Sequence, residues 1–240
     1  MYPILGRYGS FFLYSYTVLL GIGIGLSLLW TRWRLGKRPF LFDLFLWCGG
    51  TAVLLGRIGF VLVEWAYFSE RPQESWQLWQ GGLAYQGVLF GGLLGLWLWQ
   101  QRQQQLHLAE FLTAFAPALA LLHLFGWAAC LLEGCAYGQP TTLSILAADL
   151  PDTFGVYALR YQTQLLGIIA SLIILLVAWW KPSFWLILAL LGLLHFSLTF
   201  LRGDPAIPIG HWRLDTLLSL ATTLIALFLL QYNMKNQKTE

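Results

Sequence analysis

Hydrophobic runs long enough to cross a bilayer constrain the fold of this sequence more than any other feature. A helix needs about 20 mainly apolar residues to cross the hydrocarbon core, and seven runs approach or exceed that length. They are Ser10–Trp30, Phe40–Val63, Leu83–Trp99, Leu108–Leu132, Gln164–Trp180, Phe184–Leu201 and Leu214–Tyr232. Apolar residues make up 58% of the chain and charged residues only 10%, against about 25% charged in soluble domains. The sequence therefore predicts an all-α integral membrane protein with seven transmembrane helices.

The chain is expected to form one membrane domain over residues 1–234, followed by a short cytoplasmic tail over 235–240. The longest connection, Ala136–Thr163, contains two prolines and is predicted to be a folded external loop or a short surface helix. Arg7 is followed by a run too long for a signal peptide, so no cleaved leader is expected. The net charge of +3 is small, which argues against nucleic acid as a partner.

Lysine and arginine distribution predicts the orientation, because cytoplasmic loops of membrane proteins are enriched in these residues. One side would carry Arg32, Arg34, Lys37, Arg38, Arg102, Lys181, Lys235 and Lys238. The other side would carry Arg7, Arg71, Arg160, Arg202 and Arg213. We therefore expect the N-terminus outside and the C-terminus in the cytoplasm.

Two glycine-rich stretches, Gly81–Gly95 and Gly126–Pro140, combine small, polar and aromatic residues at the ends of apolar runs. Irregular backbone is tolerated in a membrane only where protein buries it or where it lines a cavity. These stretches are therefore predicted to line a pocket at the outer face of the membrane. Close helix packing is the alternative. It accounts well for Gly91, Gly92 and Gly95 but poorly for Gly81, Gly82 and Gly87.

Ionisable residues inside the apolar runs are candidates for function, because charge is costly in hydrocarbon. Arg57 could bind a phosphate group, or it could be a buried cation paired with Glu64 or Glu133. His123 and Glu133 could be functional or could be satisfied core groups, and His195 lies on roughly the same helical face as Arg202.

Outside the runs, Arg202 and Asp204 could serve the site or form a surface ion pair. Cys48, Cys130 and Cys135 lack zinc-type spacing, and their odd number does not imply a disulfide framework. Apolar packing is expected for Cys130 and Cys135, with a reactive role as the alternative. Nothing in the sequence suggests a metal or organic cofactor.

Five blocks, taken in order, resemble the bacterial prolipoprotein diacylglyceryl transferase family. They are Asp43–Phe60, Gly81–Gly95, His123–Thr141, Arg160–Leu165 and Gly192–Asp204. The second resembles the family signature Gly-Gly-φ-x-φ-His-Gly-Gly-φ-φ-Gly, and the third resembles a variant ending Gly-Cys-Cys-Tyr-Gly-x-Pro-Thr. The resemblance implies seven transmembrane helices in a bacterial plasma (inner) membrane and a site open to the outer leaflet.

The resemblance also implies a reaction. The diacylglyceryl group of phosphatidylglycerol is transferred to the thiol of a prolipoprotein lipobox cysteine, the first step of lipoprotein maturation. The expected partners are therefore phosphatidylglycerol, prolipoprotein signal peptides and the membrane itself. A cation has to hold the phosphate, and a base has to help deprotonate a thiol of pKa about 8.5.

Several charged positions of the family differ in this chain. The histidine of the third-helix signature is replaced by Gln86, and the arginine of the fourth-helix signature, which holds the lipid phosphate in the family, is replaced by Trp127. An arginine and a glutamate of the sixth helix correspond to His195 and Thr199. Gln86 can form hydrogen bonds but cannot act as a base at neutral pH.

The candidate site residues follow from these considerations. The predicted catalytic residues are His195, Gln86 and His123. The predicted lipid- and phosphate-binding residues are Arg57, Arg202, Arg160, Trp127, Gly87, Gly134 and Gly138. The predicted supporting residues are Glu133, Asp204 and Tyr85.

Three functions remain open at this point. The chain could be an active diacylglyceryl transferase, or a divergent family member with lost or changed catalysis that binds lipid or lipoprotein. It could also be an unrelated channel or transporter. The third is disfavoured, because transporters usually show internal repeats and none is visible in the sequence.

Overall fold

The computed structural model describes residues 4–9, 11–36, 38, 40–102, 108–152 and 154–236. Within this part of the chain, each predicted apolar run contains one long helix. These helices are α1 (Ser15–Leu35), α2 (Phe40–Val63), α4 (Tyr85–Arg102), α5 (Leu108–Glu133), α6 (Thr163–Trp180), α7 (Phe184–Thr199) and α8 (Leu214–Asn236). The fold is therefore mostly helical, as predicted.

Five of these helices, α1, α2, α5, α6 and α8, are long and apolar enough to cross a membrane. Helix α7 is also apolar but shorter, and α4 contains four glycines and ends in a polar turn. The protein is thus a multi-pass helical membrane protein. The number of seven spans stays a prediction.

The chain divides into two compact units. The first combines Met1–Ser27 with Leu112–Glu240, and the second is Leu28–Phe111, so α1 and α5 contribute to both. The predicted single domain over 1–234 is not tested by this division. The predicted tail 235–240 begins inside α8, which continues to Asn236. Residues 237–240, with Lys238, lie outside the described residues, as does Lys37.

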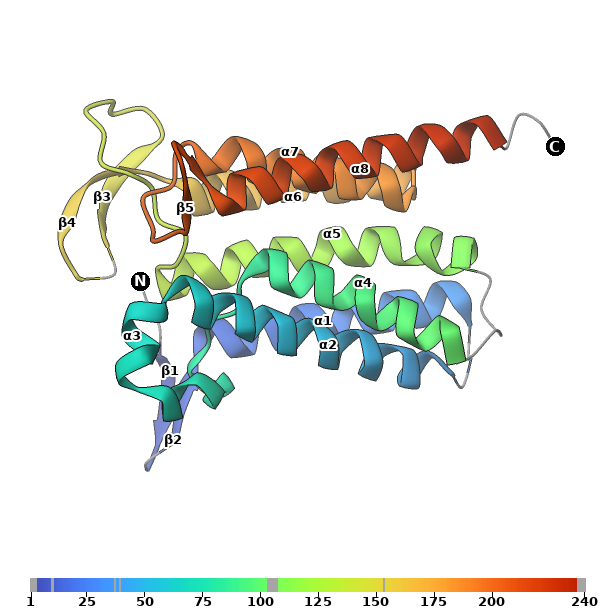
Figure 1. Cartoon of the computed structure of the whole chain (residues 1–240), viewed down its shortest axis with the longest axis horizontal. Helices are drawn as coiled ribbons and strands as arrows, with labels where there is room; N and C mark the ends of the chain where they lie inside the picture. The colour runs from blue at the N-terminus through green and yellow to red at the C-terminus, as the bar shows by residue number, and fades with distance from the viewer. Residues whose placement is uncertain are drawn as a thin grey trace. The chain divides into compact units, whose positions relative to one another are not determined.

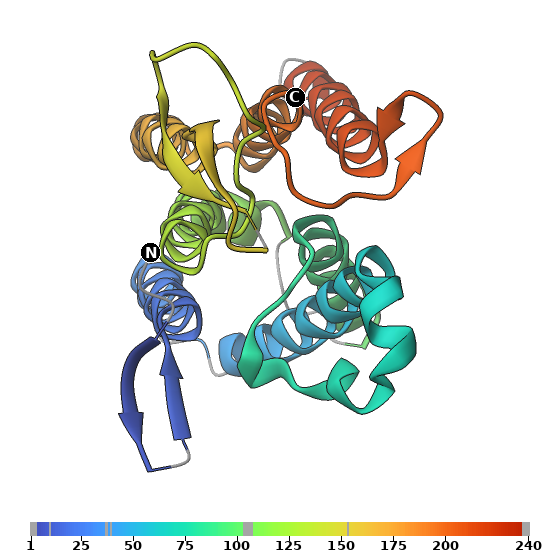
Figure 2. The same cartoon turned by 90° about the vertical axis from the view of Figure 1, so that its left-hand side faces the viewer.

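In the first unit, α6, α7 and α8 lie side by side (Figure 1). Three antiparallel hairpins precede or join the helices. These are β1 (Ile4–Tyr8) with β2 (Phe11–Tyr14), β3 (Ala147–Pro151) with β4 (Tyr157–Tyr161), and β5 (Pro208–Ile209) with β6 (Trp212–Arg213). The β3–β4 hairpin lies at the end of the bundle where α6 begins (Figure 2). The long connection is therefore folded, as expected.

The first predicted apolar run is only partly helical. Residues Phe11–Tyr14 form strand β2, which pairs with β1 in the register Tyr8↔Phe11 and Arg7↔Phe12, and α1 starts at Ser15. The aromatic residues Phe, Phe and Tyr favour strands, so hydropathy alone placed the helix start too early.

In the second unit, α2 runs antiparallel to α4 and packs along it. Between them the chain forms α3 (Trp65–Glu70) and the 3-10 turns η1 (Pro72–Trp76) and η2 (Leu78–Gln80). The α2–α4 contact uses glycines at four-residue spacing on α4. A Cβ atom on Gly87, Gly91 or Gly95 would lie within 3.0 Å of the α2 backbone or of Thr51. Small residues at this spacing let helix backbones approach closely.

The α2–α4 contact differs from the sequence prediction at two glycines. Gly87, for which packing was expected to be a poor explanation, lies against the backbone of Leu55 and Gly56. Gly92, which was expected to pack, has nothing within 4 Å of the position of an added Cβ atom. The packing face of α4 is therefore the stripe Gly87, Gly91 and Gly95.

We predict that Gly91→Ala lowers the thermal unfolding midpoint of the detergent-solubilised protein, whereas Gly92→Ala does not. The added methyl group at position 91 meets the carbonyl of Thr51, and overpacking of this kind typically costs about 1–3 kcal/mol. The two variants add the same atom one residue apart. Equal midpoints for both variants would contradict this account of the α2–α4 contact.

Candidate functional site

Three sequence blocks meet at one end of the first unit. Residues 134–141, which follow α5, form isolated β-bridges to both of the other blocks, Gly138 with Arg202 and Pro140 with Arg160. The amide of Gln139 donates to the carbonyl of Leu201 at 2.8 Å, and the amide of Gly203 donates to the carbonyl of Tyr137 at 2.8 Å. The end of α7 and the start of α6 are thereby joined through one irregular segment.

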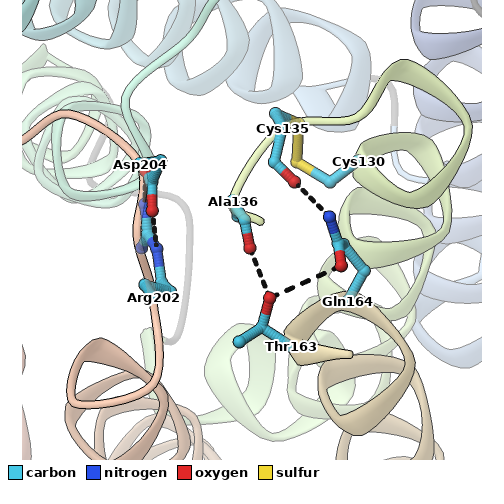
Figure 3. Close-up of a disulfide and its surroundings, with 7 residues drawn as sticks. All are labelled: Cys130, Cys135, Ala136, Thr163, Gln164, Arg202 and Asp204. Carbon is cyan, nitrogen blue, oxygen red and sulfur yellow. Dashed lines mark hydrogen bonds and ion pairs between the residues drawn. A yellow bond between two sulfur atoms is a disulfide. The ribbon is translucent and has the colours of Figure 1, made fainter. Parts of the chain in front are cut away.

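Side chains at the start of α6 hold the same segment (Figure 3). The Thr163 hydroxyl donates to the carbonyl of Ala136 at 2.5 Å, and the Gln164 side-chain amide donates to the carbonyl of Cys135 at 2.9 Å. Both α6 side chains are buried. Ala136 has a φ of 52°, an uncommon backbone conformation for a residue with a side chain, of the kind that clusters at functional sites.

A disulfide joins Cys130, in the last turn of α5, to Cys135, with the two Cα atoms 4.7 Å apart (Figure 3). The expectation that these cysteines only pack is therefore wrong. The chain reverses direction at Gly134, whose φ is 92°, and this reversal brings together two cysteines that are five positions apart in the sequence. The apolar run gives no sign of the reversal. Cys48 is a free thiol in α2.

We predict that Cys130→Ser destabilises the protein by about 2 kcal/mol, the low end expected for a disulfide that closes a short loop. Cys48→Ser should leave the thermal midpoint nearly unchanged, because Cys48 is outside the bond. A thiol reductant should lower the midpoint of the wild type but not that of Cys130→Ser. Equal sensitivity of both proteins to the reductant would rule out this role for the bond.

Arg160, on β4, is buried against the carboxylate of Asp152. The Nη2–Oδ2 distance is 3.0 Å, and the guanidinium also lies 5.3 Å from the centre of the Tyr137 ring. Asp152 accepts hydrogen bonds from the amides of Val156 and Phe154. The Val156 amide, the Phe154 amide and the charge of Arg160 hold the pKa of Asp152 below its ordinary value, against the opposing effect of desolvation. The ionised carboxylate therefore stabilises the β3–β4 hairpin.

We predict that acid loosens this hairpin through Asp152. A carboxyl whose pKa is lowered by folding stabilises the fold above its ordinary pKa of about 3.9, and that contribution is lost as the pH falls through the folded value. The protection factors of the Phe154 and Val156 amides, which correct for the intrinsic pH dependence of hydrogen exchange, should therefore fall in acid. Asp152→Asn should abolish this acid dependence. Asp149→Asn, an exposed change in β3, should retain it, and loss in both variants would contradict the assignment.

Arg202 belongs to a charge-balanced cluster of two guanidiniums and two carboxylates. Its Nε donates to Asp204 Oδ1 at 2.8 Å and its Nη2 pairs with the other oxygen of Asp204, while Nη1 lies 3.4 Å from Asp215. Arg213 pairs with Asp215 at 3.0 Å and with Asp204 at 3.5 Å. The cluster ties the exit of α7 to the start of α8. The predicted Arg202–Asp204 pair is present, and Arg213 and Asp215 were missed.

Deeper in the first unit, His123 of α5 and His195 of α7 face each other with their Nε2 atoms 2.8 Å apart. His123 Nδ1 lies 2.8 Å from the Ser171 hydroxyl of α6, which itself donates to the carbonyl of Gly167 at 2.6 Å. Trp127 stacks on His195, with ring centres 5.5 Å apart and planes at 29°. All these side chains are buried. Three helices thus converge on two candidate catalytic residues.

In the second unit, Arg57 of α2 is surrounded by backbone carbonyls. Its Nε donates to Ser75 at 2.6 Å, Nη2 donates to Glu74 at 2.8 Å, and Nη1 donates to Gly81 at 2.6 Å and Gly82 at 3.1 Å. Pairing with Glu64 or Glu133, the alternative to phosphate binding, stays a prediction. Glycine at positions 81 and 82 permits φ values of 82° and 84°. The arginine thereby fixes the connection that precedes α4.

The structure thus gathers the predicted residues into three places. His123, His195 and Trp127 are in contact inside the first unit. Arg160, Gly134, Gly138, Arg202, Asp204 and Glu133 lie in or beside the segment 134–141 of the same unit. Arg57, Tyr85, Gln86 and Gly87 belong to the second unit, the last three in the first turn of α4. Ser171 was missed, although it is a polar residue in an otherwise apolar run.

Fold and site together define a multi-pass helical membrane protein with polar motifs assembled at its helix ends and a histidine pair within its bundle. A family model described as prolipoprotein diacylglyceryl transferase matches residues 3–232. The chain belongs to the prolipoprotein diacylglyceryl transferase family.

Individual relatives agree with this assignment. A phosphatidylglycerol–prolipoprotein diacylglyceryl transferase of Hydrogenovibrio crunogenus is 28% identical over an alignment of 251 positions. The alignment covers 96% of this chain and 91% of that protein. A second, from Clostridium perfringens, is 29% identical and covers 86% of each chain. A third, from a Synechocystis species, is 31% identical over 72% of this chain and 66% of that protein.

Proposed function

We propose that this protein transfers the diacylglyceryl group of phosphatidylglycerol to the lipobox cysteine of prolipoproteins. The observation that carries the proposal is the meeting of three family blocks at residues 134–141, 160–164 and 202–204, which are joined by backbone and side-chain hydrogen bonds. The relatives from Hydrogenovibrio crunogenus and Clostridium perfringens are named for this activity. In the reaction, a carbon–sulfur bond forms to the lipid glycerol, its carbon–oxygen bond to phosphate breaks, and glycerol phosphate leaves.

In this proposal, Arg57, Arg202 and Arg160 are each candidates for the cation that holds the phosphate, and His195 takes the thiol proton. Arg57 has the charge best suited to the role. Its four described hydrogen bonds go to neutral carbonyls, so they use four of its five N–H groups without cancelling its charge. Arg202 and Arg160 each lie against a carboxylate and would have to share their donors with the lipid.

The remaining candidates have supporting roles in this proposal. Gln86 offers an amide for hydrogen bonding and Trp127 an aromatic surface. The chain reversal at Gly134 and the close backbone packing at Gly138 shape the lipid pocket. Gly87 permits the close approach of α2 to α4 beside Gln86. Glu133, Asp204 and Tyr85 position these groups.

We also propose the topology that this chemistry needs. Seven spans, with α4 and α7 crossing beside the five longer helices, would place the N-terminus outside and the C-terminus in the cytoplasm of the bacterial inner membrane. The motif segment 134–141 would then face the outer leaflet, where a lipid pocket could receive phosphatidylglycerol. The disulfide at this end supports the orientation, because structural disulfides persist mainly outside the cytoplasm.

One observation favours a second function, lipid or lipoprotein binding with lost or changed catalysis. Two positions that carry arginine in the family are occupied here by Trp127 and His195, and these two rings stack on each other. Two aromatic side chains therefore occupy the positions at which, in the family, two arginines would stabilise the phosphate leaving group. Loss of one such donor typically costs about 10²–10³ in rate.

We predict that the purified protein releases labelled glycerol phosphate from headgroup-labelled phosphatidylglycerol when a lipobox-cysteine peptide is supplied. Release should stop when the peptide cysteine is replaced by serine, because the thiol is the acceptor. A peptide-independent release would indicate a lipase instead. Absence of release from folded protein that still retains phosphatidylglycerol would contradict the transferase and favour the binding function.

A further inference from the structure

We infer that Ser171 and His123 set the tautomer of His195, so that Nδ1 of His195 is the atom that accepts the thiol proton. This inference rests on the proposed transferase function for its chemistry, but the tautomers themselves follow from hydrogen bonds within the first unit. Ser171 and His123 are positioning residues in this arrangement.

The order of donors starts at Ser171. A serine hydroxyl carries one proton and two lone pairs, and its proton is directed to the carbonyl of Gly167, one helical turn back, at 2.6 Å. The same oxygen lies 2.8 Å from Nδ1 of His123. Because the hydroxyl proton is already used, Ser171 accepts a hydrogen bond from His123. His123 therefore carries its proton on Nδ1.

The order then passes to His195. A neutral imidazole has one donor and one acceptor nitrogen, so Nε2 of His123 holds a lone pair. Nε2 of His195 lies 2.8 Å away and therefore donates its N–H to that lone pair. The lone pair of His195 is left on Nδ1. The hydroxyl proton of Ser171 thus sets the donor and acceptor of each hydrogen bond in the series Ser171–His123–His195.

Packing holds the two rings in this geometry. The His123 and His195 rings are nearly perpendicular, at 84°, which points an N–H of one ring at a nitrogen of the other. Trp127 covers one face of His195 and lies against Gly167, where an added Cβ atom would fall within 3.0 Å of the indole. Gly167 therefore serves twice, as the acceptor for Ser171 and as the space for Trp127.

This arrangement suits a base in an apolar site. When the thiol gives its proton to Nδ1 of His195, the sulfur attacks the lipid glycerol carbon, and the carbon–oxygen bond to phosphate breaks. The cation formed on His195 keeps its Nε2–H bonded to Nε2 of His123, so the second imidazole stabilises the charge. The proton then passes to the departing phosphomonoester or to water, which returns His195 to its neutral form.

Nitrogen NMR of the full-length protein with ¹⁵N-labelled histidine tests the inference directly, because protonated and unprotonated ring nitrogens have different shifts. We expect proton-bearing Nδ1 for His123 and proton-bearing Nε2 for His195. Ser171→Ala should remove the preference and yield a mixture of tautomers. Ser197→Ala is the matched control, since Ser197 also bonds a carbonyl one turn back, in α7, but is exposed and makes no described contact with the pair. The reverse tautomers in the wild type would overturn the inference.

Transfer kinetics provide the second readout. A general base contributes roughly 10²–10⁴-fold, and loss of its orientation should remove part of this, so we expect Ser171→Ala to lower kcat about tenfold with little change in KM. Ser171→Thr, which retains the hydroxyl, should recover most of the loss. An unchanged kcat for Ser171→Ala would overturn the role of the series in catalysis. The expected tautomers without any transfer by the wild type would instead refute the proposed function alone.

Discussion

The peptide groups of residues 134–141 lie outside any helix and therefore need other hydrogen-bond partners. The partners of this segment determine how the helices of the first unit are joined at this end. This segment leaves a membrane-length helix, and unpaired backbone is costly next to hydrocarbon. Thr163 and Gln164 satisfy the carbonyls of Ala136 and Cys135, and the backbone after α7 pairs with Tyr137 and Gln139. The starts and ends of three helices are thereby fixed relative to one another.

The second unit meets the same requirement with a single side chain. The connection between α3 and α4 turns through 3-10 segments and two glycines with positive φ, which leaves carbonyls directed inward. Arg57 reaches four of them from α2. A guanidinium is suited to this because its donors spread in a plane. One arginine in an apolar helix can thus organise an irregular segment while retaining its positive charge.

The sequence predicted the helices well, because long apolar runs report directly on membrane-length helices. It predicted contacts between helices poorly, because hydropathy says nothing about which faces meet. His123 and His195 were singled out separately, but their contact through adjoining helices and the part played by Ser171 depend on helix rotation. The bond between Cys130 and Cys135 was missed because it needs a chain reversal at Gly134. The strand Phe11–Tyr14 was taken as helix because aromatic residues raise hydropathy in either conformation.

The cluster of Arg202, Asp204, Arg213 and Asp215 holds equal numbers of opposite charges. Such a group has almost no field beyond a few ångströms, and salt further reduces what remains over about 10 Å. Anions diffusing toward this end of the first unit are therefore neither attracted nor repelled by it at a distance. In the proposed function, recognition of a charged headgroup by these residues would depend on short-range hydrogen bonding. The rate of encounter would then depend on lateral diffusion in the membrane instead of electrostatic steering.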